Sequence, residues 1–269
     1  MTHAADQTRA DDRYVVNALT GQRAVITGAA GGIGEATARA FAAAGVKLAL
    51  IDIEGSRLSS LAEILRSQGA EVHIFDVDIS NAQQVNEAVE GASTALGGID
   101  ILVHSAGIGV ESLFVDTTDE QWQRILDVDL TGSFLVLRAV ARIMAVARYG
   151  RIITISSTAG VRGGTRRAAY GAAKAGVIML TRVLAVELAD QGITANCLAP
   201  GAIETELVQE MHSLETRTTY RAAIPADRYG TPDDVAHAAL FLASPRSGYV
   251  NGHILAVDGG FLAAGLIIR

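Results

Sequence analysis

The feature that most constrains the fold of this sequence is a regular alternation, from residue 23 onward, of short β-branched runs with longer helical patterns. This alternation is typical of βαβ units, in which parallel strands form one sheet and the connecting helices cover both of its faces. The predicted fold class is therefore α/β, with a doubly wound parallel sheet in a single domain. The expected strands span 23–27, 47–52, 71–76, 99–105, 150–156, 194–199 and 253–257. The expected helices span about 33–44, 55–68, 81–97, 119–147, 168–190 and 232–243, several of them followed by a C-cap glycine at 45, 69, 97 or 192.

The length and composition of the chain fit one large domain. Its 269 residues are 49% hydrophobic and 19% charged, which supplies ample apolar side chains for a core and gives no compositional reason for disorder. Residues 1–18 are predicted to be a polar N-terminal tail, since they lack the apolar segment of a signal peptide. Residues 19–269 are predicted to form the single domain.

Charge and cysteine content exclude several classes of protein. The formal net charge is −7 and Lys and Arg are scattered, so the chain offers no cationic surface for nucleic acid. The single cysteine, Cys197, cannot form an intramolecular disulfide, and no Cys/His cluster has zinc-ligand spacing. No apolar run approaches the roughly 18 consecutive residues that a membrane span requires. We therefore expect a cytoplasmic protein without a metal, a nucleic-acid partner or a membrane partner.

The first expected strand runs directly into the glycine-rich segment TGAAGGIG, residues 27–34, which leads into the first expected helix. Its glycines at 28, 32 and 34 allow a tight turn and a close approach of the backbone to a pyrophosphate. The helix N-terminus adds free N–H groups and a positive dipole end. Glycine-rich turns also occur for packing alone, but the strand before and the helix after favour a dinucleotide-binding turn.

Asp52 falls at the end of the second expected strand, where a carboxylate can accept both ribose hydroxyls of an adenosine. The same anion would repel a 2′-phosphate, and no Arg or Lys lies within the glycine-rich turn or directly after Asp52 to offset it. The sequence therefore predicts NAD rather than NADP as the cofactor.

Two further strand ends carry residues that suit a dinucleotide site. Asp76 closes the third expected strand, where its carboxylate can accept a proton from the adenine amino group or, equally, act as a helix N-cap or loop carboxylate. The segment HSAG, residues 104–107, ends the fourth expected strand with small residues that allow the backbone to approach the nicotinamide. A simple strand-to-loop turn is the competing interpretation of this segment.

The candidate catalytic residues are Ser157, at the carboxyl end of the fifth expected strand, and Tyr170 and Lys174, which are i and i+4 on the following helix. Oxidation of an alcohol requires a base, and free tyrosine, with a pKa near 10, is a poor base at neutral pH. A neighbouring ammonium favours the phenolate, and Ser157 can hydrogen-bond the substrate oxygen. Taken singly, these residues also fit an exposed helical pair and a turn cap; their joint order favours catalysis.

These residues together resemble the short-chain dehydrogenase/reductase (SDR) family, and the similarity extends over about residues 19–262. The motifs that carry it are TGAAGGIG, Asp52, Asp76, HSAG, ISS at 155–157, YGAAK at 170–174, NCLAPGAIET at 196–205 and VDGGF at 257–261. The resemblance implies a Rossmann-type sheet of seven strands, with Tyr170 as acid/base, Lys174 binding the nicotinamide ribose and Ser157 orienting the substrate. Tetramers or dimers are the implied assemblies. The implied cofactor site comprises Gly28, Gly32, Ile33, Gly34, Asp52, Asp76, Val77, Ser105, Ala106, Gly107, Tyr170, Lys174, Pro200, Gly201, Ile203 and Thr205.

The sequence departs from the family pattern at two places. His104 and Ser105 stand where the family usually has two asparagines, and Asp129, in DVDLTG, stands where the family has an Asn in its proton relay. We therefore include Asp129 among the candidate catalytic residues. We hypothesise that an ionised Asp129 raises the pKa of Lys174, so that the relay ends at a carboxylate rather than an amide.

The stretch 205–229 is polar and weakly periodic, and it lies between a strand and the next helix. This favours a substrate lid, with an ordinary surface excursion as the alternative. Together with about 107–116 and 158–168 it would form the substrate walls. Arg162, Arg166, Arg167 and Arg217 in these segments fit an acidic substrate or, equally, solvated loop charges.

The leading functional hypothesis is an NAD-dependent oxidoreductase that interconverts a secondary alcohol and a ketone. The alternatives are a 3-oxoacyl-thioester reductase, which usually draws on NADPH, and a dinucleotide-binding regulator without turnover. Helices 119–147 and 168–190 carry apolar residues on more than one face, so we also predict a homo-oligomer, a tetramer or a dimer.

Overall fold

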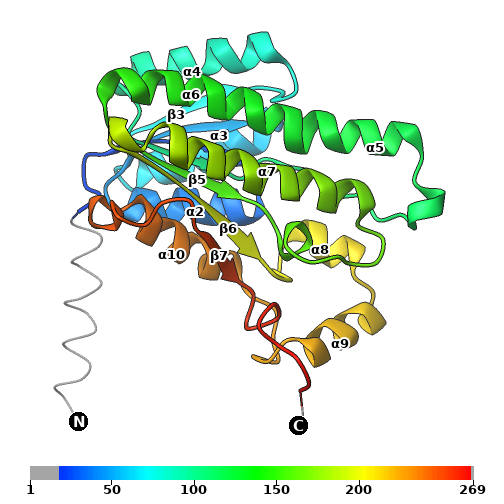
Figure 1. Ribbon diagram of the computed structural model, residues 1–269. Coiled ribbons are helices and arrows are strands. Elements are labelled where there is room, and N and C mark those ends of the chain that lie inside the picture. Colours follow the sequence, from blue (N-terminus) through cyan, green and yellow to red (C-terminus); the bar gives the residue numbers. More distant parts are fainter. Residues whose placement is uncertain (1–17, 268–269) are drawn as a thin grey trace, which may run out of the picture.

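The computed structural model describes residues 18–267, so nearly all of the predicted polar tail, 1–18, lies outside the described residues. All the paired strands are parallel and form one seven-stranded sheet in the order β3-β2-β1-β4-β5-β6-β7 (Figure 1). The predicted α/β fold class is confirmed. The strands are β1 Arg23–Thr27, β2 Lys47–Asp52, β3 Val72–Asp76, β4 Ile101–His104, β5 Gly150–Ile155, β6 Ile193–Pro200 and β7 Ile254–Val257.

Each predicted helix is present, but two regions differ from the expectation. The predicted helix 119–147 is divided by a π-helical segment, Leu126–Gly132, and the predicted lid contains two short helices, α8 and α9. The helices are α2 Gly32–Ala43, α3 Gly55–Ser67, α4 Ala82–Leu96, α5 Asp119–Ile125, α6 Ser133–Ala147, α7 Ala168–Glu187, α8 Glu206–Met211, α9 Leu214–Ala223 and α10 Pro232–Ala243.

The helices cover both faces of the sheet and create two hydrophobic cores. Side chains of α2, α3 and α10 pack with one face, and side chains of α4, α6 and α7 pack with the other. Figure 1 shows α2 and α10 below the sheet and α4 and α6 above it. The central strands are buried on both faces because each lies between these two helical layers, which explains their near-continuous apolar sequences.

The strand order has a switch point at β1 and β4. From β1 the chain first adds β2 and β3 on one side of the sheet and then returns to add β4 on the other side of β1. In open parallel sheets, ligands bind outside the carboxyl ends of the strands at such a switch point. The ends of β1 and β4, at Thr27 and His104, therefore mark the expected site.

Glycines end several of these helices as predicted. Gly45, Gly69, Gly97 and Gly192 have φ angles of 75°, 90°, 76° and 76°, the left-handed region that other residues rarely adopt. Gly97 is the C-cap of α4, and Gly45 and Gly69 directly follow the C-cap residues of α2 and α3, whereas Gly192 ends the 3-10 turn Ala189–Gln191 that follows α7.

Two helical stretches, Asp119–Ala147 and Ala168–Glu187, are long and apolar enough to cross a membrane by length and composition alone. Charged residues interrupt both stretches, so neither contains a long uninterrupted apolar run. Side chains on one side of α6 and α7 pack in the core beside the sheet, and core helices of water-soluble proteins pass the same test of length and composition.

Candidate active site

The glycine-rich turn connects the end of β1 to the start of α2. Gly28 has φ 68°, and a Cβ at this position would lie 2.7 Å from the backbone nitrogen of Ala106. Gly31 is the N-cap of α2 and provides no side-chain cap, so the first N–H groups of the helix remain open to a ligand. These donors and the positive end of the helix suit the pyrophosphate of a dinucleotide.

Asp52 is held beside this turn by two backbone donors. Its Oδ2 accepts from the N–H of Ala30 at 2.8 Å, and its Oδ1 accepts from the N–H of Glu54 at 3.1 Å. Each carboxylate oxygen retains a second lone pair, which is available to a ribose hydroxyl. Val77 donates its N–H to the carbonyl of Asp52 at 2.8 Å, which ties the neighbouring strand end to the same place.

Arg57, on α3, is a residue near the turn that sequence reasoning missed. Its Nη2 lies 3.1 Å from the position of a Cβ at Gly31, so the guanidinium is next to the glycine-rich turn. Arg57 also forms ion pairs with Glu206 at 2.9 Å and Glu54 at 3.5 Å, and the hydrogen bond to Glu206 raises its pKa despite partial desolvation. No local sequence signal indicated this contact, because Glu206 is far from Arg57 in the chain.

Asp76 does not cap a helix. It ends β3 with an exposed side chain, and a Cβ at Gly55 would lie 2.6 Å from its Oδ2. The N-cap of α4 is Asn81, whose side chain accepts from the N–H groups of Gln83 and Gln84. The N-cap interpretation of Asp76 is therefore wrong. Asp76 is the register partner of Asp52 in the pairing of β3 with β2, so both carboxylates lie at the carboxyl ends of neighbouring strands.

The segments after β4 and β6 reach the turn from the other side. Ser105 donates its N–H to the carbonyl of Thr27 at 3.2 Å, and Ala106 donates to the hydroxyl of Thr27 at 3.3 Å. After β6, the methyl group of Thr205 lies 3.2 Å from the position of a Cβ at Gly32. The structure thus brings both predicted segments, 105–107 and 200–205, to the glycine-rich turn.

The candidate catalytic residues lie on α7 and in the turn that follows β5. Lys174 Nζ lies 5.5 Å from the ring centre of Tyr170, and the Lys174 side chain is 6% exposed, which rules out an exposed helical pair. Ser157 Oγ accepts from the N–H of Ala159 at 3.1 Å, in the turn that follows β5. Ser156, which sequence reasoning did not select, donates its hydroxyl to the carbonyl of Lys174 at 2.8 Å and so joins the two elements.

Asp129 lies in the π segment and contacts Lys174 directly. Lys174 Nζ is 3.1 Å from Asp129 Oδ2, and the N–H of Ile108 donates to Oδ1 at 2.8 Å. Burial lowers the pKa of the Lys174 ammonium, but its charge interactions with Asp129 and Tyr170 and its hydrogen bond to Asp129 outweigh burial and raise that pKa. A Cβ at Gly107 would lie 2.9 Å from Lys174 Nζ and 3.0 Å from Asp129 Oδ2, so a side chain at this position would displace the pair.

His104 is buried between the turn and the π segment. Its Nδ1 lies 2.8 Å from Thr27 Oγ1 and its Nε2 lies 2.8 Å from Ser133 Oγ. Burial, with the charge of Lys174, lowers the pKa of His104 to about 3, so the imidazole is neutral. The departure of His104 from the family's Asn was the only sequence signal for this network.

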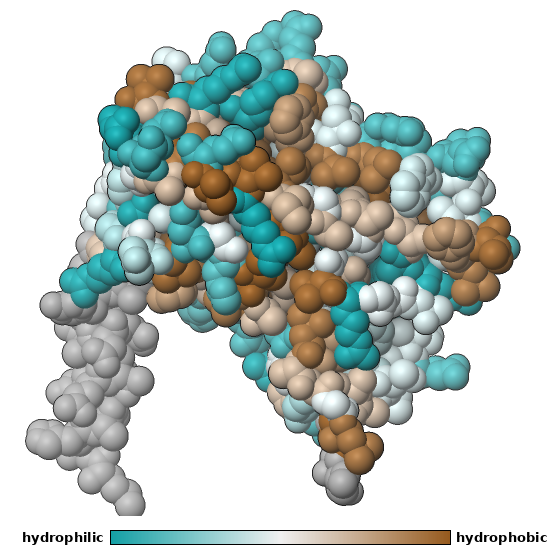
Figure 2. All heavy atoms as spheres, viewed as in Figure 1, coloured by the Kyte–Doolittle hydropathy of each residue, from teal (hydrophilic) through white to brown (hydrophobic). Residues whose placement is uncertain are grey.

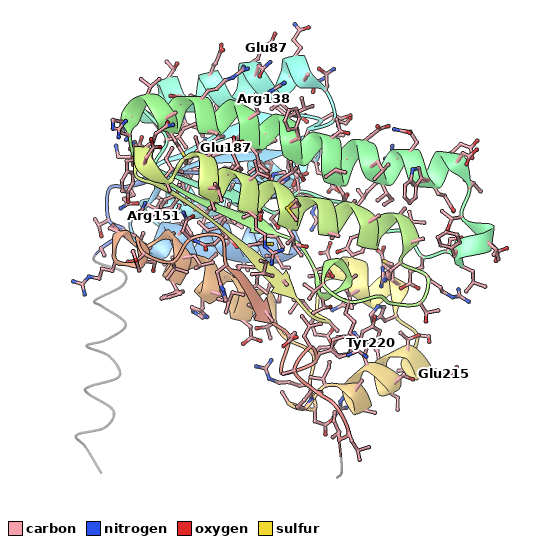
Figure 3. All side chains as sticks on the ribbon, in the orientation of Figure 1. Glu87, Arg138, Arg151, Glu187, Glu215 and Tyr220 are labelled. Carbon is pink, nitrogen blue, oxygen red and sulfur yellow. The ribbon has the colours of Figure 1, made fainter. Side chains whose placement is uncertain are left out.

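The predicted lid is more ordered than its weak periodicity indicated. Tyr220, labelled on α9 in Figure 3, stacks on His212 with ring centres 4.9 Å apart, and the hydroxyl of Tyr229 lies 2.9 Å from His212 Nδ1. Arg217 forms a bidentate pair with Glu204, both hydrogen bonds 2.7 Å long. These contacts join α8 and α9 to the body of the protein.

The arginines near the site have different partners. Arg167 pairs with Glu111 at 2.6 Å, and Arg162 lies over the ring of Phe261 at 5.2 Å. A pocket of about 450 Å³ at the start of α7 is lined by parts of two predicted substrate walls, 113–114 and 163–168. Ser157 and Tyr170 are not among its lining residues, so this pocket lies beside the catalytic residues rather than over them. Within residues 18–267, no three His, Cys, Asp or Glu side chains group to hold a metal ion.

A doubly wound sheet with a glycine-rich turn, a carboxylate at the end of β2 and a tyrosine beside a buried lysine defines a dinucleotide-binding oxidoreductase fold and site. The family described as Enoyl-(Acyl carrier protein) reductase matches residues 28–262, and the chain belongs to the short-chain dehydrogenase/reductase family, whose members bind nicotinamide dinucleotides.

Three known proteins illustrate the similarity. Nodulation protein G of Rhizobium sp. (strain N33) is 40% identical over 90% of this chain and 97% of that protein. The 3-oxoacyl-[acyl-carrier-protein] reductase of Synechocystis sp. (strain ATCC 27184 / PCC 6803 / Kazusa) is 39% identical over 92% of this chain and 99% of that protein. The crystal structure of a putative gluconate dehydrogenase from Agrobacterium tumefaciens superimposes with a TM-score of 0.89, with 33% identity over 93% of this chain and 99% of that one.

Proposed function

We propose that this SDR oxidoreductase transfers a hydride between NAD(H) and a small secondary alcohol or ketone, with Tyr170 as the acid/base. The observation that carries the proposal is the buried ammonium of Lys174 beside Tyr170, with Gly107 next to the ammonium and the adjoining Ala106 against Gly28 of the glycine-rich turn. A phenol beside a buried cation suits proton transfer at a carbon–oxygen bond.

Three side chains act at the substrate oxygen, namely Tyr170, Lys174 and Ser157. A bound nicotinamide dinucleotide accepts or supplies the hydride. The Tyr170 oxygen removes the proton of the alcohol, and the charge of Lys174 stabilises the negative charge on that oxygen. Ser157 Oγ already accepts a hydrogen bond from Ala159, so its own proton is free to be donated to the substrate oxygen.

Asp129 completes the catalytic group as the buried partner of Lys174. The carboxylate keeps the ammonium charged, and the N–H of Ile108 fixes one of its oxygens. A proton relay through Lys174 would therefore end at an anion, which distinguishes this chain from family members with an Asn at that position.

NAD is the proposed cofactor because the charges around the turn disfavour a 2′-phosphate. Asp52 is an anion at the place of the adenosine ribose. Arg57 could accommodate a phosphate there, but Glu54 and Glu206 already neutralise it. The proposed contacts to NAD are Gly28, Gly32, Ile33, Gly34, Asp52, Asp76, Val77, Ser105, Ala106, Gly107, Tyr170, Lys174, Pro200, Gly201, Ile203 and Thr205.

The proposal has three further parts: a substrate lid, a homo-oligomeric state and a cytoplasmic location. Residues 205–229 act as the substrate lid, because Thr205 contacts the cofactor turn and α9 packs near Phe261. The protein is a homo-oligomer, a dimer or a tetramer. Its single cysteine, Cys197, is buried and free, which fits a reducing cytoplasm.

The test is a spectrophotometric comparison of NAD⁺ with NADP⁺ across panels of polyols, hydroxy acids and sterols. The proposal expects turnover with NAD⁺ and at least tenfold lower kcat/KM with NADP⁺, about 1.4 kcal/mol of discrimination. In Asp52→Ser the preference should weaken, because the repelling anion is gone. A wild-type enzyme that prefers NADP⁺ would contradict the cofactor assignment.

The similarity to a 3-oxoacyl-[acyl-carrier-protein] reductase favours reduction of a 3-oxoacyl thioester as the second candidate function. The test compares two rates: oxidation of NADPH by a 3-oxoacyl thioester, and reduction of NAD⁺ or NADP⁺ by each alcohol. A higher rate with the thioester than with any alcohol would establish this function. The third candidate is a dinucleotide-binding regulator, motivated by Asp129 and His104; tight NADH binding without turnover on either panel would favour that role.

A further inference from the structure

His104 is a polar side chain in the centre of the sheet that the proposed chemistry does not use. It ends β4 and is 1% exposed. Its ring bridges Thr27, the last residue of β1, and Ser133, the first residue of α6, with both contacts 2.8 Å long. The imidazole therefore joins the strand before the glycine-rich turn to the helix after the π segment.

The hydrogen bonds that link Thr27, His104, Ser133 and Asp129 form one path. The position of each proton along it can be assigned from the Asp129 end. Ser133 Oγ lies 2.6 Å from the backbone carbonyl oxygen of Asp129, which can only accept. The hydroxyl of Ser133 therefore donates to Asp129 and accepts from the Nε2–H of His104. His104 Nδ1 is then an acceptor, and the hydroxyl of Thr27 donates to it.

The remaining end of the path agrees with this direction. The N–H of Ala106 donates to Thr27 Oγ1 at 3.3 Å, which leaves the Thr27 proton free for the imidazole. His104 is thus the neutral Nε2–H tautomer, and each hydrogen bond points from Ala106 toward Asp129. A neutral ring acts here through hydrogen bonds and shape rather than through charge.

The path ends on the residue that pairs with the catalytic lysine. The carbonyl of Asp129 accepts from Ser133, and the carboxylate of the same residue lies 3.1 Å from Lys174 Nζ. Both groups belong to the π segment, whose hydrogen bonds differ from those of the helices on either side. A change in the backbone at Asp129 therefore moves its carboxylate relative to Lys174.

We propose that His104 is a positioning residue, which holds the π segment against the sheet through Ser133 and so sets the Asp129–Lys174 pair. Its effect on catalysis rests on the proposed function, whereas the hydrogen-bond path does not.

Two substitutions separate the two ends of the imidazole. The amide of Gln reaches the place of Nε2, so His104→Gln keeps a donor for Ser133. The shorter Asn reaches only the place of Nδ1, so His104→Asn keeps the contact with Thr27 and loses the one with Ser133. Thr181→Val is the matched control, because it removes another buried hydrogen bond, the 2.7 Å contact with Thr154, outside this path.

The expected kinetic results follow from the path. His104→Asn and Ser133→Ala each lower kcat about tenfold, the effect of one lost buried hydrogen bond, and shift the pH–kcat profile alike. The double variant is no worse than either single variant, because both break one path. His104→Gln and Thr181→Val keep the wild-type profile. A wild-type profile in His104→Asn, with a loss of stability like that of Thr181→Val, would overturn the proposal.

A second measurement, by NMR, needs no turnover, so it tests the positioning role of His104 even if the proposed function fails. In ¹⁵N-labelled protein, the His104 ring should be a neutral Nε2–H tautomer that does not titrate between about pH 5 and 8, unlike an ordinary histidine. The Lys174 ammonium resonance should move in His104→Asn and Ser133→Ala but not in His104→Gln. An Nδ1–H tautomer, or a Lys174 resonance that is unchanged in all variants, would exclude the positioning role.

Discussion

The ammonium of Lys174 lies 3.1 Å from the carboxylate of Asp129, and the two side chains are 6% and 0% exposed. A buried cation is stable only beside a counter-charge, so each of these residues depends on the other. The pair also places a full negative charge behind the lysine that assists Tyr170. The first prediction concerns this charge.

Asp129→Asn should change the pH dependence of kcat and lower stability. The pKa of Lys174 is raised in the folded protein, so its stabilising contribution is present below the ordinary lysine value of about 10.4 and is lost as pH rises through the folded pKa. The variant should therefore lose stability at neutral pH, by about 3 kcal/mol. The checks are pH–kcat profiles and urea unfolding, with Asp127→Asn, at a half-buried carboxylate of the same π segment, as the control. Superimposable profiles would mean that the charge of Asp129 does not matter to the relay.

Tyr170→Phe tests the proposed acid/base. The substitution removes one oxygen atom and keeps the ring beside Lys174 and Arg167. We expect kcat to fall by about 10²–10⁴-fold, the usual contribution of general acid–base catalysis, with NADH binding retained. Tyr249→Phe, at an exposed position, is the matched control and should retain full activity. If Tyr170→Phe keeps more than a tenth of the wild-type kcat, another group transfers the proton.

The sequence predicted the site well where the topology of the sheet decides it. In a parallel sheet all carboxyl ends lie at one edge, so Asp52, Ser157 and the glycine-rich turn could be placed together from strand positions alone. The pairing of Asp129 with Lys174 was expected from the family pattern, and the structure places the two atoms in contact.

The features that the sequence did not reveal depend on contacts between distant segments. A π segment leaves the apolar periodicity of 119–147 intact, so the pattern indicated one helix. The bond of His104 to Ser133 and the ion pair of Arg57 with Glu206 join residues with no fixed spacing in the chain. Helices α8 and α9 are short and polar, and tertiary packing rather than periodicity stabilises them.

Glu206→Gln should weaken the preference for NAD⁺ over NADP⁺. The substitution removes a carboxylate that lies 2.9 Å from Arg57 and frees the guanidinium for a 2′-phosphate. Because the pair is exposed, we expect at most about 1 kcal/mol, or roughly a fivefold change in relative kcat/KM, and a smaller change at high salt.

Two variants check the cause of that change. Glu210→Gln, on the same helix, is the control and should leave the preference unchanged. Adding Arg57→Gln to Glu206→Gln should restore the wild-type preference, because the cation is then absent. An unchanged preference in Glu206→Gln at low salt would show that Arg57 does not reach the cofactor phosphate.

Val186→Glu should disrupt the predicted oligomer. Helices α5, α6 and α7 carry exposed apolar side chains, and hydrophobic atoms gather over this face in Figure 2. Val186 is 80% exposed in the single chain, and burying a valine against a partner contributes about 1.5–3 kcal/mol. A glutamate there loses this contribution and adds the cost of desolvating a charge. Other large apolar side chains exposed on these helices are Trp122, Phe134, Val146, Met179 and Val183.

Light scattering at micromolar concentration is the measurement for this prediction. The wild-type protein should have the mass of a dimer or a tetramer, and Val186→Glu should have a smaller mass with an unchanged circular dichroism spectrum. Ile64→Glu is the matched control, since Ile64 is an exposed apolar residue on α3, which packs on the opposite face of the sheet. A monomeric wild-type protein would contradict self-association, whereas dissociation by both variants would place an interface on α3 as well.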